Sequence, residues 1–299
     1  MNSGNHTRRN NCGCGRRRVV VSALMASAFT LLSACTGSGP VDVIEGEALS
    51  FLDEVFAYTA ENDLQYGSAL DENGAQEALL LDLFQPRDDE RPLRPAVVWL
   101  HGGSFRQGHK GEMTDFARRS ARHGFVSVSI NYRLRENVDF NYLDPSDELA
   151  EDVKQDAQHD VQAAVRWLRS QATALRIHPA HIYVTGYSSG AVAGLRAAAR
   201  PNDPGSSGNP EASSVVTAAA AISGSLEPGM LEAATGSTLL IHGQNDTKVP
   251  IDGMTAACGA VPRCRLVAIP LGEHNLISLA KETIVAEIAA FLHGEVMTP

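Results

Sequence analysis

A Gly-x-Ser-x-Gly pentapeptide, Gly186 to Gly190, lies between two segments of opposite character. The segment His181–Thr185 before it is apolar and β-branched, which predicts a strand, and Ala191–Ala199 after it is rich in alanine, which predicts a helix. A strand that turns at once into a helix strains its turn residue, and flanking glycines remove β-carbons that would collide. The run therefore predicts a sharp turn that projects the hydroxyl of Ser188 above a sheet.

A serine at such a turn suggests nucleophilic attack on an acyl carbon, with the N–H of Ser189 pointing toward the developing oxyanion. The pentapeptide alone is weakly specific, because Gly and Ser are common in loops. The hypothesis therefore depends on whether the chain also supplies a base, a carboxylate to orient that base, and further oxyanion donors.

The rest of the chain alternates apolar strands with helical segments, which predicts a mainly parallel sheet covered by helices on both faces. The segment 44–60 is loosely helical in its pattern, and 44–75 is a candidate for part of a small cap. Helices are expected over Thr114–His123, Leu149–Ala174, Ala191–Ala199 and Leu276–His293. Strands are expected over Ala78–Phe84, Pro95–Leu100, Gly124–Ile130, His181–Thr185, Val215–Ile222, Thr238–Ile241 and Arg265–Ile269.

Candidate oxyanion donors follow the buried strand that ends at Leu100, in the run His-Gly-Gly-Ser-Phe that begins at His101. The two bare glycines allow backbone N–H groups to face a site at the end of the strand. With the N–H of Ser189, those of Gly102 and Gly103 would make an oxyanion hole of three donors. A plain turn at the strand exit is the alternative explanation of this run.

The candidate carboxylate is Asp246, which closes the run Ile-His-Gly-Gln-Asn-Asp just beyond a strand. An acid at this place can reach across the carboxyl edge of the sheet. Asp and Asn also cap turns, so an Asx-turn role is the structural alternative. Asp252, a few residues further on, is the second candidate.

The candidate base must follow the last strand, and among ten histidines His274 does so, in a loop loosened by Gly272. His242 and His101 are better explained as turn residues beside the site. Five other histidines fall on helices or their ends: His123, His159, His178, His181 and His293. We therefore expect Ser188 as nucleophile, His274 as base and Asp246 as the acid that orients it.

The chain order Ser, Asp, His is that of the α/β-hydrolases. Residues 78–292 resemble an α/β-hydrolase-fold carboxylesterase, of the broad group that includes hormone-sensitive-lipase-like esterases and the bacterial feruloyl and acetylxylan esterases. The group commonly has other residues where this chain has Ser104 and Ser189, and neither change alters a backbone N–H. The resemblance is carried by His101-Gly-Gly-Ser-Phe, Ile130-Asn-Tyr-Arg-Leu, the helical run Asp160–Arg169, the pentapeptide, His242-Gly-Gln-Asn-Asp and Gly272-Glu-His.

The resemblance implies a serine esterase that works through an acyl-enzyme and needs no metal or cofactor. Without a cap, we expect small or carbohydrate-linked esters as substrates, with Phe105 and Tyr187 lining the substrate pocket. The acidic segment that begins at Glu136 either rims the cleft or is a solvated insertion. A peptidase related to the prolyl oligopeptidases, or a non-catalytic surface lipoprotein that binds through this fold, are the alternative functions.

The first 34 residues have the pattern of an export signal. Three arginines at Arg16–Arg18 precede the apolar run Val19–Leu32, and Leu-Ser-Ala-Cys, ending at Cys35, resembles the lipobox of bacterial lipoproteins. That resemblance implies a lipid anchor on Cys35 at a bacterial membrane, a tether over 35–43 and a catalytic domain over 44–299. An ordinary secretory or a twin-arginine signal is the alternative, and oligomeric state is open.

Charge and cysteine content fit an exported enzyme. The chain carries a net charge of −10, and removal of residues 1–34, which hold five arginines and no acids, would leave a net charge of −15. Such acidity disfavours nucleic acid as a partner and electrostatic binding to anionic lipid. Outside the signal and Cys35, only Cys258 and Cys264 remain, and an even pair in an oxidising compartment predicts a disulfide between them.

Overall fold

The computed structural model describes residues 51–135, 148–225, 227 and 229–297. The predicted signal over 1–34, Cys35, the tether over 35–43 and the acidic run 136–147 lie outside the described residues. The predictions made for them therefore stay predictions. Within the described ranges, no helix combines the length and the apolar character that a membrane span requires.

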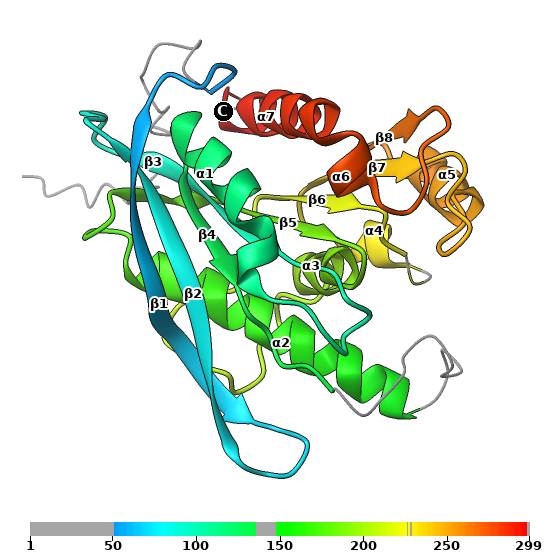
Figure 1. Cartoon of the computed structure of the whole chain (residues 1–299). Helices are drawn as coiled ribbons and strands as arrows, with labels where there is room; N and C mark the ends of the chain where they lie inside the picture. The colour runs from blue at the N-terminus through cyan, green and yellow to red at the C-terminus, as the bar shows by residue number, and fades with distance from the viewer. Residues whose placement is uncertain (1–50, 136–147, 226, 228, 298–299) are drawn as a thin grey trace, which may run out of the picture. The chain divides into compact units, whose positions relative to one another are not determined.

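Eight strands form one sheet in the order β1-β2-β4-β3-β5-β6-β7-β8. The pairs β1·β2 and β2·β4 are antiparallel, and the remaining neighbours are parallel. The predicted mainly parallel sheet is therefore confirmed (Figure 1). The strands are β1 Ala57–Leu70, β2 Gln76–Arg87, β3 Arg94–Leu100, β4 Val126–Ile130, β5 Ile177–Tyr187, β6 Ala218–Ile222, β7 Ser237–Gly243 and β8 Cys264–Ile269.

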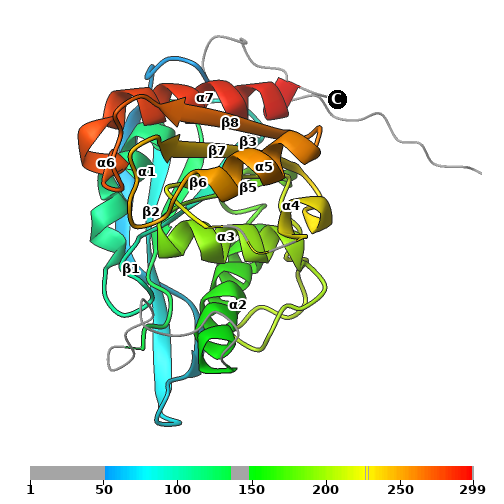
Figure 2. The same ribbon diagram turned by 90° about the vertical axis from the view of Figure 1, so that its right-hand side faces the viewer.

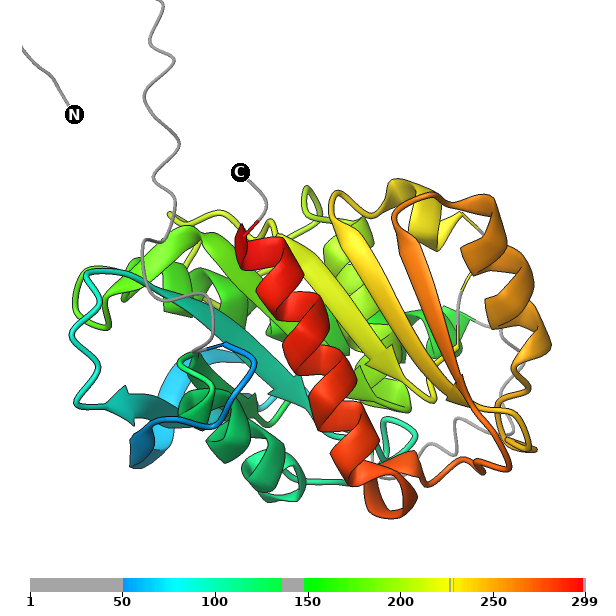
Figure 3. The ribbon, with the colours of Figure 1, turned by 90° about the horizontal axis from the view of Figure 1, so that it is seen from above.

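Helices cover both faces of this sheet, as the alternation of apolar strands and helices predicts (Figures 2 and 3). One face packs against α1 and α7, and the other against α2 and α3. The helices are the 3₁₀ helix η1 Lys110–Met113, and α1 Thr114–Arg122, α2 Glu148–Ser170, α3 Ser189–Ala199, α4 Met230–Ala233, α5 Asp252–Ala260, α6 Leu276–Leu279 and α7 Lys281–Met297.

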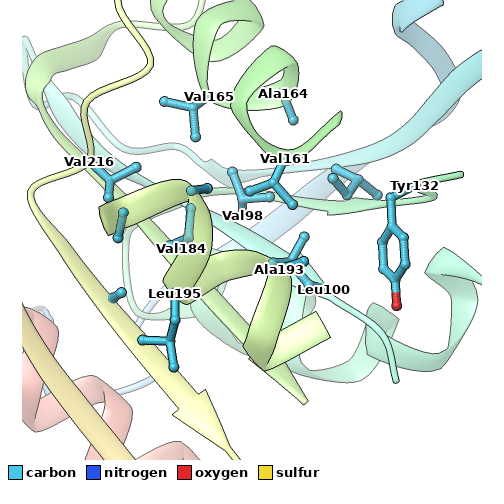
Figure 4. Packing of buried hydrophobic residues seen from close by; sticks show 14 of the residues in the cluster. Val98, Leu100, Tyr132, Val161, Ala164, Val165, Val184, Ala193, Leu195 and Val216 are labelled. Atoms are coloured by element: carbon cyan, nitrogen blue, oxygen red, sulfur yellow. The ribbon is translucent and has the colours of Figure 1, made fainter. Parts of the chain in front are cut away.

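The central strands are buried on both faces, which explains their unbroken apolar sequences. Every residue of β3, β4 and β6 is buried. On one face, Val98 and Leu100 of β3 pack with Val161 and Val165 of α2, as Figure 4 shows. This rigid centre holds the carboxyl ends of the parallel strands at one edge, where the predicted site residues follow them.

The helical pattern expected over 44–60 is wrong for the part of that range that is described, and the candidate cap over 44–75 stays a prediction. Residues 57–70 form β1, which pairs antiparallel with β2 as a long hairpin along one sheet edge (Figure 1). The pairing shifts register between Glu61 and Leu64 and again between Gln65 and Gly67. Each irregularity interrupts the two-residue alternation of a strand, so the sequence pattern hid it.

The C-terminal region contains one departure from expectation and one confirmed prediction. The single helix expected over Leu276–His293 is divided into α6 and α7 by Ala280, whose φ of −132° and ψ of 30° are not helical. The predicted disulfide is present, and it joins Cys258 of α5 to Cys264 at the start of β8. The bridge therefore ties α5 to an edge strand of the sheet.

Replacing both cysteines, Cys258→Ser with Cys264→Ser, is expected to lower the free energy of unfolding by about 2 kcal/mol, because a short closed loop removes only modest entropy from the unfolded chain. Urea unfolding monitored by circular dichroism measures the change. Reduction of the native protein is the matched control and should give the same loss. Equal stability of the reduced and oxidised protein would contradict the prediction.

Candidate active site

The pentapeptide forms the sharp turn that its sequence predicts. Ser188 follows β5 and precedes α3, with φ 53° and ψ −119°, a conformation that residues with side chains rarely adopt. A β-carbon on Gly186 would lie 2.3 Å from the carbonyl oxygen of Gly190, and one on Gly190 would lie 2.3 Å from that of His101. Only glycine fits at both positions, and the strained serine between them stands at the carboxyl edge of the sheet.

The structure brings Ser188, His274 and Asp246 together from three loops. Ser188 Oγ lies 3.0 Å from His274 Nε2, and His274 Nδ1 lies 2.8 Å from Asp246 Oδ2. A carboxylate only accepts, so Nδ1 carries the proton and Nε2 is left to accept the hydrogen of the serine hydroxyl. The three side chains thus form a continuous chain of hydrogen bonds from Ser188 to the acid.

The carboxylate of Asp246 is fixed in place and held ionised. Its side chain is fully buried, and Oδ1 accepts from the N–H groups of Lys248 and Val249, each at 2.9 Å. Burial raises the pKa of this carboxyl, but the hydrogen bonds from Val249, His274 and Lys248 together lower it below its ordinary value. Asp252, the second candidate, is an exposed residue of α5, so Asp246 is the acid at His274.

A second histidine contacts the same carboxylate. His242 Nε2 lies 2.7 Å from the carbonyl oxygen of Val249 and 3.3 Å from Asp246 Oδ2. Both neighbours are acceptors, so Nε2 is the protonated nitrogen, and it ties the Asp246 loop to the end of β7. The sequence placed His242 beside the site but gave it no partner. Its position four residues before Asp246 in the same strand-exit turn was the available signal.

The candidate oxyanion loop lies against the nucleophile. A β-carbon on Gly102 would be 3.2 Å from the Ser188 β-carbon, so this stretch of backbone runs directly beside the serine. The carbonyl of Gly103 accepts from the N–H groups of Arg106 and Gln107, both at 3.1 Å, which closes a tight turn. Among the described residues, no backbone carbonyl accepts a hydrogen bond from the N–H groups of Gly102 and Gly103.

The two expected pocket residues differ in exposure. The Tyr187 ring lies 5.6 Å from that of His274 and its hydroxyl is 3.3 Å from the His274 carbonyl oxygen, while burial raises its pKa to about 12. Phe105 is only 1% exposed and packs edge-on against Tyr132. Phe105 therefore supports the oxyanion loop from the core, and contact with a substrate stays a prediction for both residues.

His101, at the end of the oxyanion loop nearest the sheet, is fully buried and stacks on Tyr132, with ring centroids 4.4 Å apart. Its Nδ1 lies 2.7 Å from the carbonyl oxygen of Gly102. Burial lowers the pKa of this imidazole to about 4. His101 is thus a neutral structural residue.

The buried His101 is expected to make the protein less stable in mild acid. In the unfolded chain the His101 imidazole has its ordinary pKa of about 6.5. Between pH 6.5 and 4 it therefore binds a proton in the unfolded chain but stays neutral in the folded protein. Stability from this group is complete above pH 6.5 and declines by about 1.4 kcal/mol per pH unit below it. Urea unfolding at several pH values measures the slope. His101→Phe, which keeps a stacking ring, should reduce it, and an unchanged slope would assign the proton to another group.

No group of three or more His, Cys, Asp or Glu side chains within the described ranges is arranged to hold a metal ion. The site residues found are those of acyl transfer: a hydroxyl, an imidazole, a carboxylate and backbone N–H groups.

Comparison with known proteins agrees with this arrangement. A family model described as BD-FAE matches residues 81–223, just under half of the chain. A para-nitrobenzyl esterase of Bacillus subtilis is 30% identical over 117 residues, which are 39% of this chain and 23% of that protein. A venom carboxylesterase of Apis mellifera is 29% identical over 120 residues, which are 39% of this chain and 20% of that protein. The chain thus spans about a fifth to a quarter of these relatives.

Solved structures match over a larger share of the chain. The apo form of Thermogutta terrifontis esterase 2 has a TM-score of 0.64 at 22% identity, and covers 80% of this chain and 96% of its own. The native form of the same esterase has a TM-score of 0.63 at 21% identity, and covers 78% of this chain and 91% of its own. The curated relatives and the solved structures are themselves described as esterases, and the structural match shows that this chain shares the α/β-hydrolase fold.

Proposed function

We propose that this chain is a serine ester hydrolase. The observation that carries the proposal is the hydrogen-bonded series Ser188, His274, Asp246 at a strained strand-to-helix turn. This arrangement activates a hydroxyl for attack on an acyl carbon. The esterase relatives support the same reaction class.

The reaction would proceed in two steps, acylation of Ser188 and hydrolysis of the acyl-serine. Ser188 Oγ attacks the carbonyl carbon as its proton passes to His274 Nε2, and the N–H groups of Gly102, Gly103 and Ser189 stabilise the oxyanion. The C–O bond to the alcohol breaks as His274 returns the proton to the leaving oxygen. A water molecule then attacks the acyl-serine by the same route, which releases the carboxylic acid and restores the hydroxyl.

Asp246 would act by keeping His274 in the required tautomer and by stabilising the imidazolium that forms in each step. Its buried, hydrogen-bonded carboxylate suits this role, because its lowered pKa keeps it charged in mild acid. Loss of activity in mild acid should therefore not arise from protonation of Asp246.

We further propose esters of short acyl chains, free or linked to carbohydrate, as substrates. Thermogutta terrifontis esterase 2 has been solved with propionate and with butyrate bound. Because this chain shares its fold, these bound acids support a preference for short acyl chains. Residues 57–70 form β1 at the edge of the sheet. The carbohydrate link rests on the family resemblance alone.

Covalent labelling tests the reaction class directly. Paraoxon phosphorylates Thermogutta terrifontis esterase 2, and we expect it to add one diethylphosphoryl group to Ser188 of this protein, located by peptide mass spectrometry. Turnover of p-nitrophenyl acetate, butyrate, octanoate and palmitate, with methyl ferulate alongside, then defines the acyl preference. Label on another residue, or aminoacyl-nitroanilide turnover above ester turnover, would contradict the proposal.

We also propose export as a lipoprotein anchored through Cys35. The supporting observation is the Leu-Ser-Ala-Cys run at the end of the apolar segment Val19–Leu32. Metabolic labelling with an alkyne fatty acid should mark the native protein in a membrane fraction, whereas Cys35→Ala should be unlabelled. Equal labelling of both proteins would contradict the anchor.

A further inference from the structure

The proposed oxyanion hole draws its donors from two separate segments. Gly102 and Gly103 belong to the loop after β3, whereas Ser189 is the first residue of α3. Donors stabilise an oxyanion only when their spacing is fixed before the reaction. The pairing of β3 with β5 joins the two segments as far as Leu100 and Gly186. The donors lie beyond that pairing, so their spacing also depends on contacts between the loop and the turn.

Tyr132, two residues beyond β4, lies between these segments. Its hydroxyl is 2.9 Å from the carbonyl oxygen of His101 and 3.2 Å from Ser189 Oγ. A carbonyl only accepts, so the one phenolic hydrogen goes to His101, and the hydroxyl of Ser189 must donate to the tyrosine oxygen. The direction of both bonds is thus determined: Ser189 donates to Tyr132, and Tyr132 donates to His101.

The surroundings of Tyr132 keep its hydroxyl in this position. The ring stacks on His101 and contacts Phe105 edge-on, and Figure 4 shows its oxygen pointing away from the labelled aliphatic side chains. Burial raises the pKa of the phenol well above its ordinary value, so it remains a neutral donor. Tyr132 therefore serves as a fixed link and is not itself an ionising group.

The backbone beside Tyr132 is anchored on its other side. The N–H of Arg133 donates to Asp160 Oδ2 at 2.8 Å, and the Arg133 guanidinium contacts Asp160 Oδ1 at 2.9 Å. Asp160 is fully buried in α2 and also accepts from Ser207 Oγ at 2.6 Å. These bonds join the Asn-Tyr-Arg segment after β4 to Asp160 of α2. They hold the backbone on the C-terminal side of Tyr132 in place.

We propose that Tyr132 and Ser189 are positioning residues for the oxyanion hole, acting as a brace that fixes the Gly102 and Gly103 donors relative to the Ser189 donor. The brace is the hydrogen-bond series from Ser189 Oγ through the Tyr132 hydroxyl to the His101 carbonyl. The second serine of the pentapeptide therefore contributes its side chain as well as its backbone. This inference rests on the proposed esterase function.

The brace should matter in the transition state and not in substrate binding, since oxyanion bonds strengthen as charge develops. Tyr132→Phe removes both bonds and is expected to lower kcat about 10- to 100-fold, less than the loss of a whole donor. Ser189→Ala leaves the bond to His101 intact and is expected to lower kcat about 3- to 10-fold. An interaction made only in the transition state lowers kcat and kcat/KM equally when it is lost. KM should therefore stay within about twofold of the wild-type value in each variant.

The experiment measures p-nitrophenyl butyrate kinetics and paraoxon labelling for the wild type, Tyr132→Phe, Ser189→Ala and the double variant. A displaced hole slows phosphorylation yet lets every molecule react eventually, whereas damaged folding leaves a fraction unlabelled. We expect slower labelling with full final occupancy. The acid limb of the pH profile should not move, because the His274 and Asp246 pair is untouched.

The double variant tests the link itself. If the two hydroxyls form one series, Ser189→Ala should have less than about a twofold further effect in the Tyr132→Phe background. Tyr66→Phe is the matched control, since the Tyr66 hydroxyl donates at 2.6 Å to the carbonyl of Asn131 but does not contact the hole. We expect it to lower the melting temperature while kcat stays within about twofold of the wild type.

The outcomes separate this inference from the proposed function. A wild type that neither turns over esters nor takes the label would overturn the esterase proposal. A wild type that does both, with variants that match its kcat and labelling rate, would overturn the brace, as would fully independent effects in the double variant. If Tyr132→Phe does not fold, the kcat and labelling rate of Ser189→Ala, which only removes an oxygen atom, decide the question.

Discussion

Ser188→Ala is expected to lower kcat for p-nitrophenyl butyrate by about a millionfold, the size of loss that follows removal of the nucleophile from a Ser-His-Asp site. In this variant His274 Nε2 would face the methyl group of Ala in place of the serine hydroxyl, so it would have no proton to accept. KM should change little, because the hydroxyl contributes mainly to the transition state. Steady-state kinetics, with paraoxon labelling as a second measurement, should show both activities lost together.

A matched variant separates chemistry from folding at this position. Ser188 has φ 53°, which glycine adopts readily and alanine does not. Ser188→Gly should therefore be as inactive as Ser188→Ala but about 1 kcal/mol more stable in urea unfolding. Residual activity above a thousandth of the wild-type rate in either variant would show that another residue is the nucleophile.

Asp246→Asn is expected to lower kcat about ten-thousandfold, as the same change does in a serine protease of this type. The backbone N–H groups of Lys248 and Val249 both donate to Oδ1, so they select the amide oxygen of the asparagine for that position. The amide NH₂ then faces His274 Nδ1 in place of Oδ2. His274 must move its proton to Nε2, where it can no longer accept from Ser188.

Asp252→Asn is the control for this prediction, because Asp252 is an exposed acid six residues away on α5. Its kcat and pH profile should equal those of the wild type. Substantial loss of kcat in Asp252→Asn, with Asp246→Asn active, would reassign the acid. Circular dichroism should confirm that both variants keep the native fold.

Much of the site could be located from sequence because its residues follow strands. Ser188, Asp246 and His274 each come after a β-strand: Ser188 and Asp246 follow the buried ends of β5 and β7, and His274 follows the partly exposed edge strand β8. Parallel strands bring their carboxyl ends to one edge, so position in the chain predicted proximity in space. The glycines of the pentapeptide were equally informative, since only a close backbone approach requires them.

Other features could not be predicted, because no local pattern encodes them. The irregular pairing of β1 erased its alternation, so a hairpin looked like a loose helix. The packing of Phe105 against Tyr132, a residue 27 positions later in the chain, has no signal in the sequence. The contact of His242 with Asp246 depends on how one turn closes, which the three intervening residues do not specify.

The sequence by itself therefore predicted the fold class, the disulfide pair, the nucleophile and the base, with Asp246 and Asp252 as the candidates for the acid. These depend on periodicity, on glycine geometry and on the order of elements, all of which are local or additive along the chain. Only the tertiary structure decided the hydrogen-bond partners: which acid His274 contacts, which carboxylate oxygen is fixed, and how Tyr132 links Ser189 to His101. Such bonds require atoms from distant segments to meet within about 3 Å, and a one-dimensional pattern carries no such distance.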